Sequence, residues 1–192
     1  MLLTCRFCAC CTELFTNEGQ SHHVLWLLHQ LRWTDRWVFE KADRDGKYPV
    51  HTMLSEKCNV SDAGLHVARE MIKILLEAYP GCVKEMVGGR TLLHMAVLNG
   101  WPCHDLLLAL HPESLDVRDP ETDLYPFQTA AISSTEQSAV DSMGYSLDVT
   151  YELFRANPSL GRGLVEGGDE NGRSRRSACL TCFIMYQYRS FA

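Results

Sequence analysis

The feature that most constrains this chain is a short motif that occurs three times with decreasing clarity. Its best copy is residues 89–96, Gly-Arg-Thr-Leu-Leu-His-Met-Ala, which follows a turn and opens a predicted helix. Weaker copies stand at residues 45–51, Asp-Gly-Lys-Tyr-Pro-Val-His, and at residues 123–130, Asp-Leu-Tyr-Pro-Phe-Gln-Thr-Ala. Recurrence at a regular period indicates an array of similar structural units, so it restricts the fold before any single residue is considered.

The spacing of the copies supports a repeat. His51 and His94 stand 43 residues apart, and His94 and Gln128 stand 34 residues apart. Each copy is followed by a second apolar segment that ends at a similar phrase containing a proline (Pro80, Pro112 and Pro158). We therefore expect two helices in each unit. The outer two units have about 11–12 more residues between their two helices than the middle unit, judged by the same repeat phrase.

The apolar periodicity predicts where these helices lie. Short first helices are expected over residues 49–55, 92–98 and from 126 to 132, and second helices over residues 65–79, 102–110 and 147–156. Residues 57–64 and 133–144 are expected to be long polar loops. Residues 22–39 have the three- and four-residue apolar steps of a buried helical face, so Trp26, Trp33 and Trp37 are expected in core or end-cap packing.

The middle copy resembles the ankyrin repeat, whose first helix opens with Gly-x-Thr-Pro-Leu-His-x-Ala after a β-turn. The matching residues are Gly89, Thr91, Leu93, His94 and Ala96, with Gly100 in the turn between the helices and Leu92 in place of the family's proline. The first copy keeps Gly46, Pro49 and His51, and the third keeps Pro126 and Ala130 with Gln128 at the histidine position.

The resemblance implies a mostly α fold, an ankyrin-like solenoid of stacked helix–turn–helix repeats with β-turn or hairpin tips. The three repeats are expected over residues 43–84, 85–117 and 118–160. Residues 1–42 are interpreted as a Cys-rich segment with an eroded repeat or cap helix, and residues 161–192 as a Gly-rich linker and an apolar tail.

In this reading the motif residues are structural. Thr91 and His94 are expected to hydrogen-bond to the backbone and to neighbouring repeats, whereas Tyr48 and Tyr125 occupy the threonine position and lose the cap. Because Gln128 replaces the histidine only in part, the outer repeats are expected to be less stable than the middle one.

The resemblance also implies a non-catalytic protein–protein interaction module that binds through the turn tips and the inner helices. The candidate partner-binding residues at the tips are Arg44, Lys47, Glu85, Arg90, Arg118 and Glu121. Their charges are mixed, so no single ligand charge is favoured. The partner is expected to be another protein, which the sequence does not name, and the oligomeric state is open.

Composition excludes some classes of function. Of the 192 residues, 46% are hydrophobic and 22% charged, as in a folded globular chain. The net charge of −6 argues against a nucleic-acid partner, which requires a concentrated basic surface. No apolar stretch reaches the length of a membrane span, and no secretory signal is evident. Nine cysteines without disulfide-like spacing favour reduced thiols in the cytosol or nucleus.

No cofactor and no enzymatic activity are expected, because the chain lacks a paired general acid and base and a phosphate-binding glycine loop. One alternative is a zinc- or thiol-dependent protein, since Cys5 and Cys8 followed by His23 and His29 loosely fit a Cys2His2 spacing. Another is that the chain is a fragment of a larger repeat scaffold.

Overall fold

The computed structural model describes residues 18–58, 62–136 and 140–160, with side chains over residues 25–58, 64–133 and 148–160. Within these ranges the chain is mostly helical, as predicted, with seven α-helices and no strand. The α-helices are α2 (Glu18–Thr34), α3 (Pro49–Ser55), α4 (Asp62–Ala78), α5 (Leu92–Leu98), α6 (His104–Leu110), α7 (Pro126–Glu136) and α8 (Val140–Ala156). Short 3-10 helices follow three of them: η1 (Arg36–Val38), η2 (Pro80–Lys84) and η3 (Pro112–Asp116).

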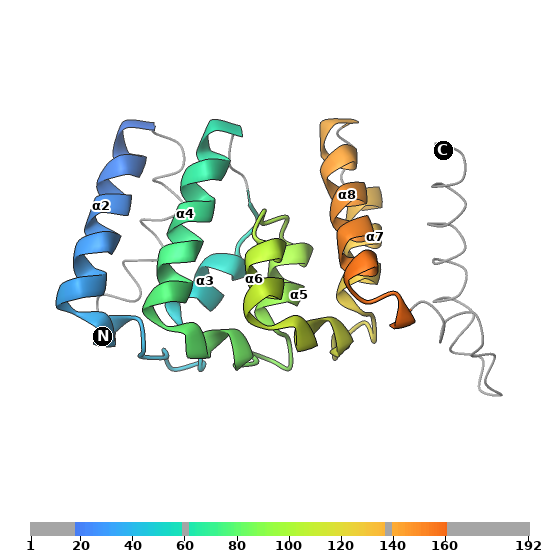
Figure 1. The fold of residues 1–192 in the computed structure, drawn as a ribbon, viewed down its shortest axis with the longest axis horizontal. Helices are drawn as coiled ribbons and strands as arrows, with labels where there is room; N and C mark the ends of the chain where they lie inside the picture. Colours follow the sequence, from blue (N-terminus) through green and yellow to red (C-terminus); the bar gives the residue numbers. More distant parts are fainter. Residues whose placement is uncertain (1–17, 59–61, 137–139, 161–192) are drawn as a thin grey trace. The chain divides into compact units, whose positions relative to one another are not determined.

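The chain divides into two compact units, Met1–Pro112 and Glu113–Ala192. In the first unit α2 packs against α4 and α3 packs against α5, while α3 also contacts α4 and α5 contacts α6 (Figure 1). In the second unit α7 packs against α8. Within the described ranges, no helix combines the length and the apolarity needed to cross a membrane.

The short first helices begin where local signals place them. Pro49 occupies the first turn of α3, where its missing N–H is not needed for an intrahelical hydrogen bond. Thr91 caps α5, since its side-chain oxygen accepts a hydrogen bond of 3.4 Å from the His94 backbone N–H. Tyr48 precedes α3 without a side-chain cap, which is the loss expected at that position.

Helices α4 and α5 both contribute many side chains to the core of the first unit. Along α4 the buried apolar residues recur mostly at three- and four-residue steps and form one broad buried face (Ala68, Met71, Ile72, Ile74, Leu75, Leu76, Ala78). In α5 every residue from Leu92 to Val97 is buried. A helix covered on nearly all sides depends on its neighbours for stability, so α5 is the centre of the unit.

The end of α3 is clamped by the turn between α5 and α6. The side-chain amide of Asn99 donates a 2.8 Å hydrogen bond to the Leu54 carbonyl, and the indole N–H of Trp101 donates one of 2.7 Å to the Glu56 carbonyl. In return the Cys58 N–H donates to the Asn99 carbonyl at 2.8 Å. The last carbonyls of a helix have no partner inside it, so this clamp satisfies two acceptors at the end of α3.

A second link joins α4 to α6. The Arg69 guanidinium donates to both carboxylate oxygens of Asp105, at 2.7 Å to Oδ1, and it also donates to the Pro102 carbonyl at 2.8 Å. The hydrogen bonds from Arg69 lower the pKa of the Asp105 carboxyl group. This two-pronged geometry sets the position of α6 along α4 more strictly than a single ion pair does.

The two predicted loops are wrong in part. Helix α4 already begins at Asp62, inside the predicted loop 57–64. The predicted loop 133–144 is occupied by the end of α7, which continues to Glu136, and by the start of α8 at Val140. The additional residues of the outer units therefore lengthen helices. Pairing with a neighbouring helix stabilises such extensions even where the composition is polar.

The predicted burial of the tryptophans is also wrong. Helix α2 ends at Thr34 and buries Leu28, but Trp26, Trp33 and Trp37 are 60%, 78% and 58% exposed. Trp26 and Trp33 are seven residues apart and so share one side of α2, but that side is exposed, and Trp37 lies beyond α2 in η1. Trp101, by contrast, is only 3% exposed.

The second unit is held by aromatic and amide contacts. Phe127 on α7 meets Phe154 on α8 edge-on, with ring centroids 5.7 Å apart. Gln128 is buried, and its side-chain oxygen accepts a 3.0 Å hydrogen bond from the Tyr125 N–H. Gln128 thus supports the start of α7 by reaching backward along the chain, in the manner of the second residue of a capping box.

Replacement of Asn99 by alanine tests the clamp. The substitution removes the donor to the carbonyl of Leu54, a residue with 0% exposure, and an unsatisfied buried acceptor costs about 1–3 kcal/mol. We expect a loss of that size in the free energy of unfolding, measured by chemical denaturation. Lys73→Ala, at an exposed position on α4, is the control and should change stability by less than about 0.5 kcal/mol. Equal losses in the two variants would contradict the clamp.

Candidate functional site

The residues predicted to bind a partner lie on three loops that lead into α3, α5 and α7. We call residues 43–47 the first tip, residues 85–90 the second tip and residues 118–123 the third tip. The first two belong to the first unit and the third to the second unit. The motif residues Pro49, Thr91 and Pro126 all stand at the starts of the helices that follow these tips.

The first tip is a tight loop built on Asp43. Its carboxylate accepts hydrogen bonds from the backbone N–H groups of Asp45 and Lys47, at 2.9 and 2.8 Å. The Asp43 N–H donates to the Lys47 carbonyl at 2.9 Å, which closes the loop. Gly46 has a φ of +76°, a backbone conformation that glycine adopts without strain. The charged side chains of Arg44 and Asp45 are exposed.

The second tip is a two-residue hairpin. Val87 and Arg90 exchange two backbone hydrogen bonds of 3.1 Å, and Gly88 and Gly89 between them both have positive φ. Such a pair of glycines is the usual sequence of a tight hairpin turn. Glu85 is exposed, and Met86 beside it is 57% exposed. This tip therefore combines an acidic side chain with an exposed apolar one.

The third tip repeats the design of the first with a different residue at the strained position. The Asp119 carboxylate accepts a 2.9 Å hydrogen bond from the Glu121 N–H, and the Asp119 N–H donates to the Leu124 carbonyl at 2.9 Å. Asp123 has a φ of +58° where the first tip has Gly46. Arg118 pairs with Asp123 at 3.0 Å and lies over the Tyr125 ring. Arg118 is thus engaged within its own tip.

The second tip is tied to α3 through His51. The Nε2 atom of His51 lies 3.3 Å from the Glu85 carbonyl oxygen, so this nitrogen carries the proton. His51 has 0% exposure, and its Nδ1 atom has no hydrogen-bond partner among the described residues. Burial lowers the pKa of His51, and the Glu85 carbonyl opposes that effect only in part. The neutral imidazole therefore joins the helix after the first tip to the backbone of the second tip.

In α5, Thr91 and His94 form a buried pair. The Thr91 hydroxyl lies 2.9 Å from Nδ1 of His94, in addition to capping the helix. Gly100, with a φ of +74°, ends the helix and leads into Trp101. Leu93 and Ala96 are fully buried on the same helix. Thr91, Leu93, His94 and Ala96 are buried, so they support the helix behind the second tip and are not exposed to a partner.

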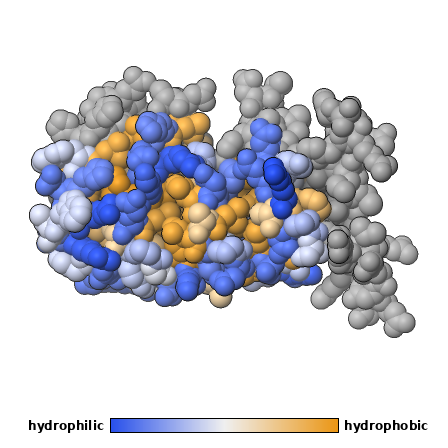
Figure 2. Space-filling model, in the orientation of Figure 1, coloured by the Kyte–Doolittle hydropathy of each residue, from blue (hydrophilic) through white to orange (hydrophobic). Residues whose placement is uncertain are grey.

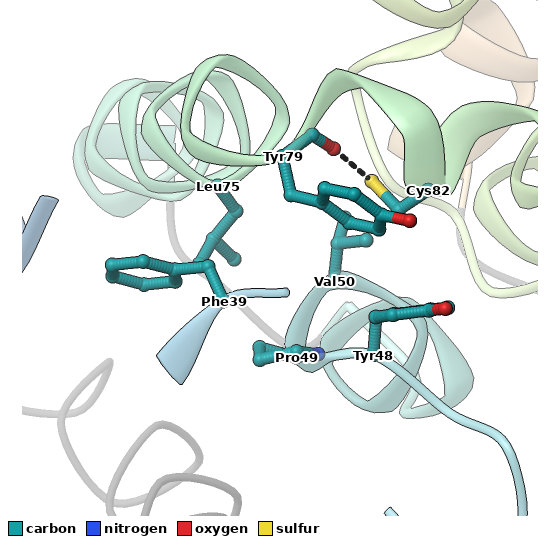
Figure 3. Close-up of a pocket in the computed structure, with 7 residues that line it drawn as sticks. All are labelled: Phe39, Tyr48, Pro49, Val50, Leu75, Tyr79 and Cys82. Carbon is teal, nitrogen blue, oxygen red and sulfur yellow. Dashed lines mark hydrogen bonds between the residues drawn. The ribbon is translucent and has the colours of Figure 1, made fainter. Parts of the chain in front are cut away.

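A shallow hollow lies beside the first tip. It is lined by Phe39, Tyr48, Pro49, Val50, Leu75, Tyr79 and Cys82, and its volume of about 160 Å³ includes open solvent (Figure 3). The rings of Tyr48 and Tyr79 stand 5.0 Å apart, and Cys82 donates from its sulfur to the Tyr79 carbonyl. Small-molecule sites are about 300–1,000 Å³, so this hollow is a packing seam between α3 and the end of α4.

The buried thiols are poor nucleophiles. Burial raises the pKa of Cys82 to about 12, and burial also raises the pKa of Cys103 strongly. Only the thiolate attacks an electrophile or binds a metal, so both groups are held in the unreactive form. Cys103 and His104 are adjacent at the start of α6, and the two together offer no activated thiolate.

Within the described part of the chain, no group of three or more His, Cys, Asp or Glu side chains is arranged to hold a metal ion. His29, one of the weak zinc candidates, is exposed on α2. Cys5, Cys8 and the side chain of His23 lie outside the described residues, as do residues 161–192. The predicted zinc spacing therefore stays a prediction.

Several residues of this site escape the sequence analysis. Asp43 and Asp119 accept the backbone hydrogen bonds that shape the first and third tips. The sequence could have indicated this role, because each aspartate stands three or four positions before a residue with positive φ. The sequence analysis also does not single out Met86. An apolar residue in a predicted turn that contains Glu85 and Arg90 is expected to be exposed, as Met86 is. The clamp of Asn99 and Trp101 has no local signal, since its partners are 45 residues away.

Comparisons with protein-family models, with curated proteins and with solved structures find no match for this chain. The function is therefore inferred from the geometry of the tips and of the helices that hold them.

The buried neutral His51 predicts a loss of stability in acid. Because burial holds the pKa of folded His51 below the ordinary histidine value of 6.5, the unfolded chain binds more protons than the folded chain as the pH falls. Its contribution to stability is thus complete above pH 6.5 and declines as the pH drops toward the folded pKa. The slope from one such group reaches at most about 1.4 kcal/mol per pH unit.

We expect His51→Gln to reduce this acid sensitivity, since glutamine retains an N–H donor for the Glu85 carbonyl and does not titrate. The free energy of unfolding of both proteins is measured by denaturation at pH 7.5 and 5.5, with His29→Gln on exposed α2 as the control. An unchanged pH dependence in His51→Gln, matching that of the control, would contradict the assignment.

Proposed function

We propose that this chain is a non-catalytic protein–protein interaction module with an ankyrin-like solenoid architecture. Its partner-binding surface consists of the first and second tips together with the helices that follow them, α3 and α5. The third tip is the corresponding element of the second unit. The partner in this proposal is another protein.

The pairing of helices supports the ankyrin-like architecture. First helices lie against each other, α3 on α5, while the long helices before and after α3 pair as α2 on α4 (Figure 1). This two-layer arrangement is what stacked helix–turn–helix repeats produce, because each unit buries its apolar face against the next. The hydrogen-bonded Thr91 and His94 stand at the motif positions that resemble the ankyrin repeat.

The observation that carries the proposal is the contact between His51 and the Glu85 carbonyl. It joins the helix that follows the first tip to the backbone of the second, so the two tips are held in a defined relation within one unit. Each tip is also closed by its own backbone hydrogen bonds. A surface whose loops are already ordered loses little conformational entropy on binding, which favours recognition of a partner.

The exposed chemistry of the two tips suits a protein partner. Arg44 on the first tip is basic, Glu85 on the second is acidic, and Met86 adds an exposed apolar side chain. A mixed surface of this kind discriminates by the placement of charges more than by net charge. Met86 is the expected anchor, because methionine adapts its shape to an apolar pocket.

Among the described residues, the thiols and the hollow that could serve an active site are poorly suited to catalysis. The buried thiols of Cys82 and Cys103 are held protonated, and the hollow beside Tyr48 is smaller than ordinary ligand sites. An interaction role therefore accounts for more of the described surface than an active site does.

Site-specific photo-crosslinking tests the proposal. We expect a photoreactive residue at Met86 or Arg44 to give discrete adducts in native lysate, whereas the same residue at Lys73, exposed on α4, gives none. Excess unlabelled protein should abolish the adducts. The double variant Arg44→Glu and Met86→Glu should compete at least about tenfold less well, the loss expected when an anchor residue contributes about 1.4 kcal/mol. Equal competition by the variant and the wild-type protein would contradict the proposed surface.

A further inference from the structure

The turn that closes the clamp contains Asn99 followed by Gly100, and the end of α5 requires the glycine. Gly100 has a φ of +74°, a conformation that residues with a side chain rarely adopt. The Trp101 N–H donates to the Ala96 carbonyl at 2.8 Å. The Gly100 N–H donates to the Val97 carbonyl at 3.4 Å, and these two bonds together form the Schellman motif of a helix end.

The clamp requires the asparagine. The side-chain amide of Asn99 donates to the Leu54 carbonyl at 2.8 Å, and a carboxylate in its place would have no proton to donate. The fold therefore needs an asparagine directly before a glycine at this turn. Asparagine followed by glycine is the dipeptide most prone to deamidation, because no side chain shields the glycine nitrogen.

Deamidation begins when the backbone nitrogen of the glycine attacks the side-chain carbonyl carbon of the asparagine. The new C–N bond closes a succinimide ring, the attacking nitrogen loses its proton, and the side-chain nitrogen leaves as ammonia. Water then opens the ring at either of its two carbonyl groups, which gives aspartate or isoaspartate. The overall reaction consumes a water molecule and releases ammonia, and it needs no oxidant or cofactor.

The closed clamp keeps the reacting groups apart. The Asn99 amide is bonded to Leu54, and the Gly100 N–H is bonded to Val97. The ψ of Asn99 is 6°, so the Gly100 nitrogen eclipses the Asn99 backbone nitrogen and is turned away from the Asn99 side chain. The Cys58 N–H, which donates to the Asn99 carbonyl at 2.8 Å, opposes rotation of that peptide group. The succinimide ring therefore forms only after the clamp opens.

Little else obstructs the reaction once the clamp is open. A methyl group added to the Gly100 Cα would meet no atom within 4 Å outside the adjoining residues, so there is space around this carbon. Asn99 is half-buried, so water reaches the turn. Folded proteins undergo local openings without unfolding globally. The rate of deamidation at Asn99 is thus expected to follow the population of the open clamp.

The product keeps the clamp open. An aspartate at position 99 places a carboxylate opposite the buried Leu54 carbonyl, and two acceptors with no proton between them repel each other. Isoaspartate also lengthens the main chain by a methylene group, which disrupts the end of α5. The apolar packing of α4, α5 and α6 is not altered by the reaction, and apolar residues also gather around α4 and α6 on the surface shown in Figure 2. We therefore expect the clamp to be lost while the helices remain.

We propose that Asn99 and Gly100 form a deamidation site controlled by the clamp. The closed clamp suppresses the reaction, opening permits it, and the product prevents the clamp from closing again. The reactant besides the chain itself is water. The site thus converts a reversible opening of the first unit into an irreversible change. This inference does not depend on the proposed partner-binding surface, because it rests on the clamp alone.

Peptide mapping by mass spectrometry on the full-length chain tests the proposal. The chain is incubated at pH 7.5 in native buffer and in guanidinium chloride, and is then digested with trypsin. Asn171 also precedes a glycine and falls in a different tryptic peptide, whereas Asn157 precedes Pro158, which has no N–H. In guanidinium chloride we expect Asn99 and Asn171 to react at similar rates, while Asn157 stays unreacted. In native buffer Asn99 should react at least about tenfold more slowly than in the unfolded chain.

Trp101→Phe tests whether the clamp controls the rate. The substitution removes the indole donor to the Glu56 carbonyl and leaves the Asn–Gly dipeptide intact. Asn99 should then react at least about threefold faster in native buffer, as expected from the loss of a hydrogen bond. Lys73→Ala, at an exposed position on α4, should leave the rate unchanged. Far-UV circular dichroism checks that both variants retain their helices.

Three results would overturn the control of this site by the clamp. One is an equal rate at Asn99 in native buffer and in guanidinium chloride. Another is an unreacted Asn99 in the unfolded chain under conditions in which Asn171 reacts. The third is a rate at Asn99 that Trp101→Phe leaves unchanged. If Trp101→Phe loses its helices, the comparison of native and unfolded wild-type chain decides alone.

Asn99→Asp represents the product and is compared with Asn99→Ala. The protonated acid donates to the Leu54 carbonyl and the ionised form does not, so folding raises the pKa of this carboxyl group. Its contribution to stability is present in acid and is lost as the pH rises through the folded pKa. Asn99→Asp should therefore have the lower denaturation midpoint at pH 7.5 and recover relative to Asn99→Ala at about pH 4, near the ordinary aspartate pKa. The two variants share the neighbouring titratable groups Glu56, Lys57 and Cys58. A difference in midpoint that does not change with pH would contradict the role assigned to the product.

Discussion

The interaction on which the first unit depends is the clamp between the end of α3 and the turn after α5. Helices α3, α5 and α6 contain seven residues each, and isolated helices shorter than about 12–15 residues are marginal in water. Their stability must come from contacts between helices. The Asn99 amide and the Trp101 indole supply donors for carbonyls that α3 cannot satisfy itself. Stacking of helix pairs is thus a condition for the helices to exist.

In this structure buried polar groups fix the positions of the loops and helix starts, whereas burial of apolar side chains provides the free energy of folding. His51 and His94 are buried inside the helical layer, and each connects a helix to a loop or to the cap of its own helix. Such groups are costly to bury unless they are hydrogen-bonded, so they define one arrangement of the loops over others. The proposed binding surface benefits directly, because the second tip is held at its backbone while its side chains are left outside.

Local signals in the sequence predict where many of the helices begin. The predictions that are wrong concern features set by contacts between residues far apart in the sequence. Pro49, Thr91 and Pro126 mark helix starts through their own backbone chemistry, so those starts agree with the structure. The polar composition of residues 133–144 predicts a loop, but the end of α7 and the start of α8 lie there, because pairing between these two helices outweighs composition. The tips could also be located, but the bond from His51 to Glu85 could not, since it spans 34 residues. The spacing of Trp26 and Trp33 shows a shared face and does not show whether that face is covered.

The most direct test of the stacked arrangement is hydrogen exchange at the Cys58 amide, measured by NMR on the full-length chain. This N–H follows α3 and is bonded across the stack to the Asn99 carbonyl. If the helix pairs stack as described, the Cys58 amide exchanges as slowly as the backbone amides inside α5. Fast exchange at Cys58 alongside protected amides in α3 and α5 would show that the helices form without stacking, and the central claim would fail.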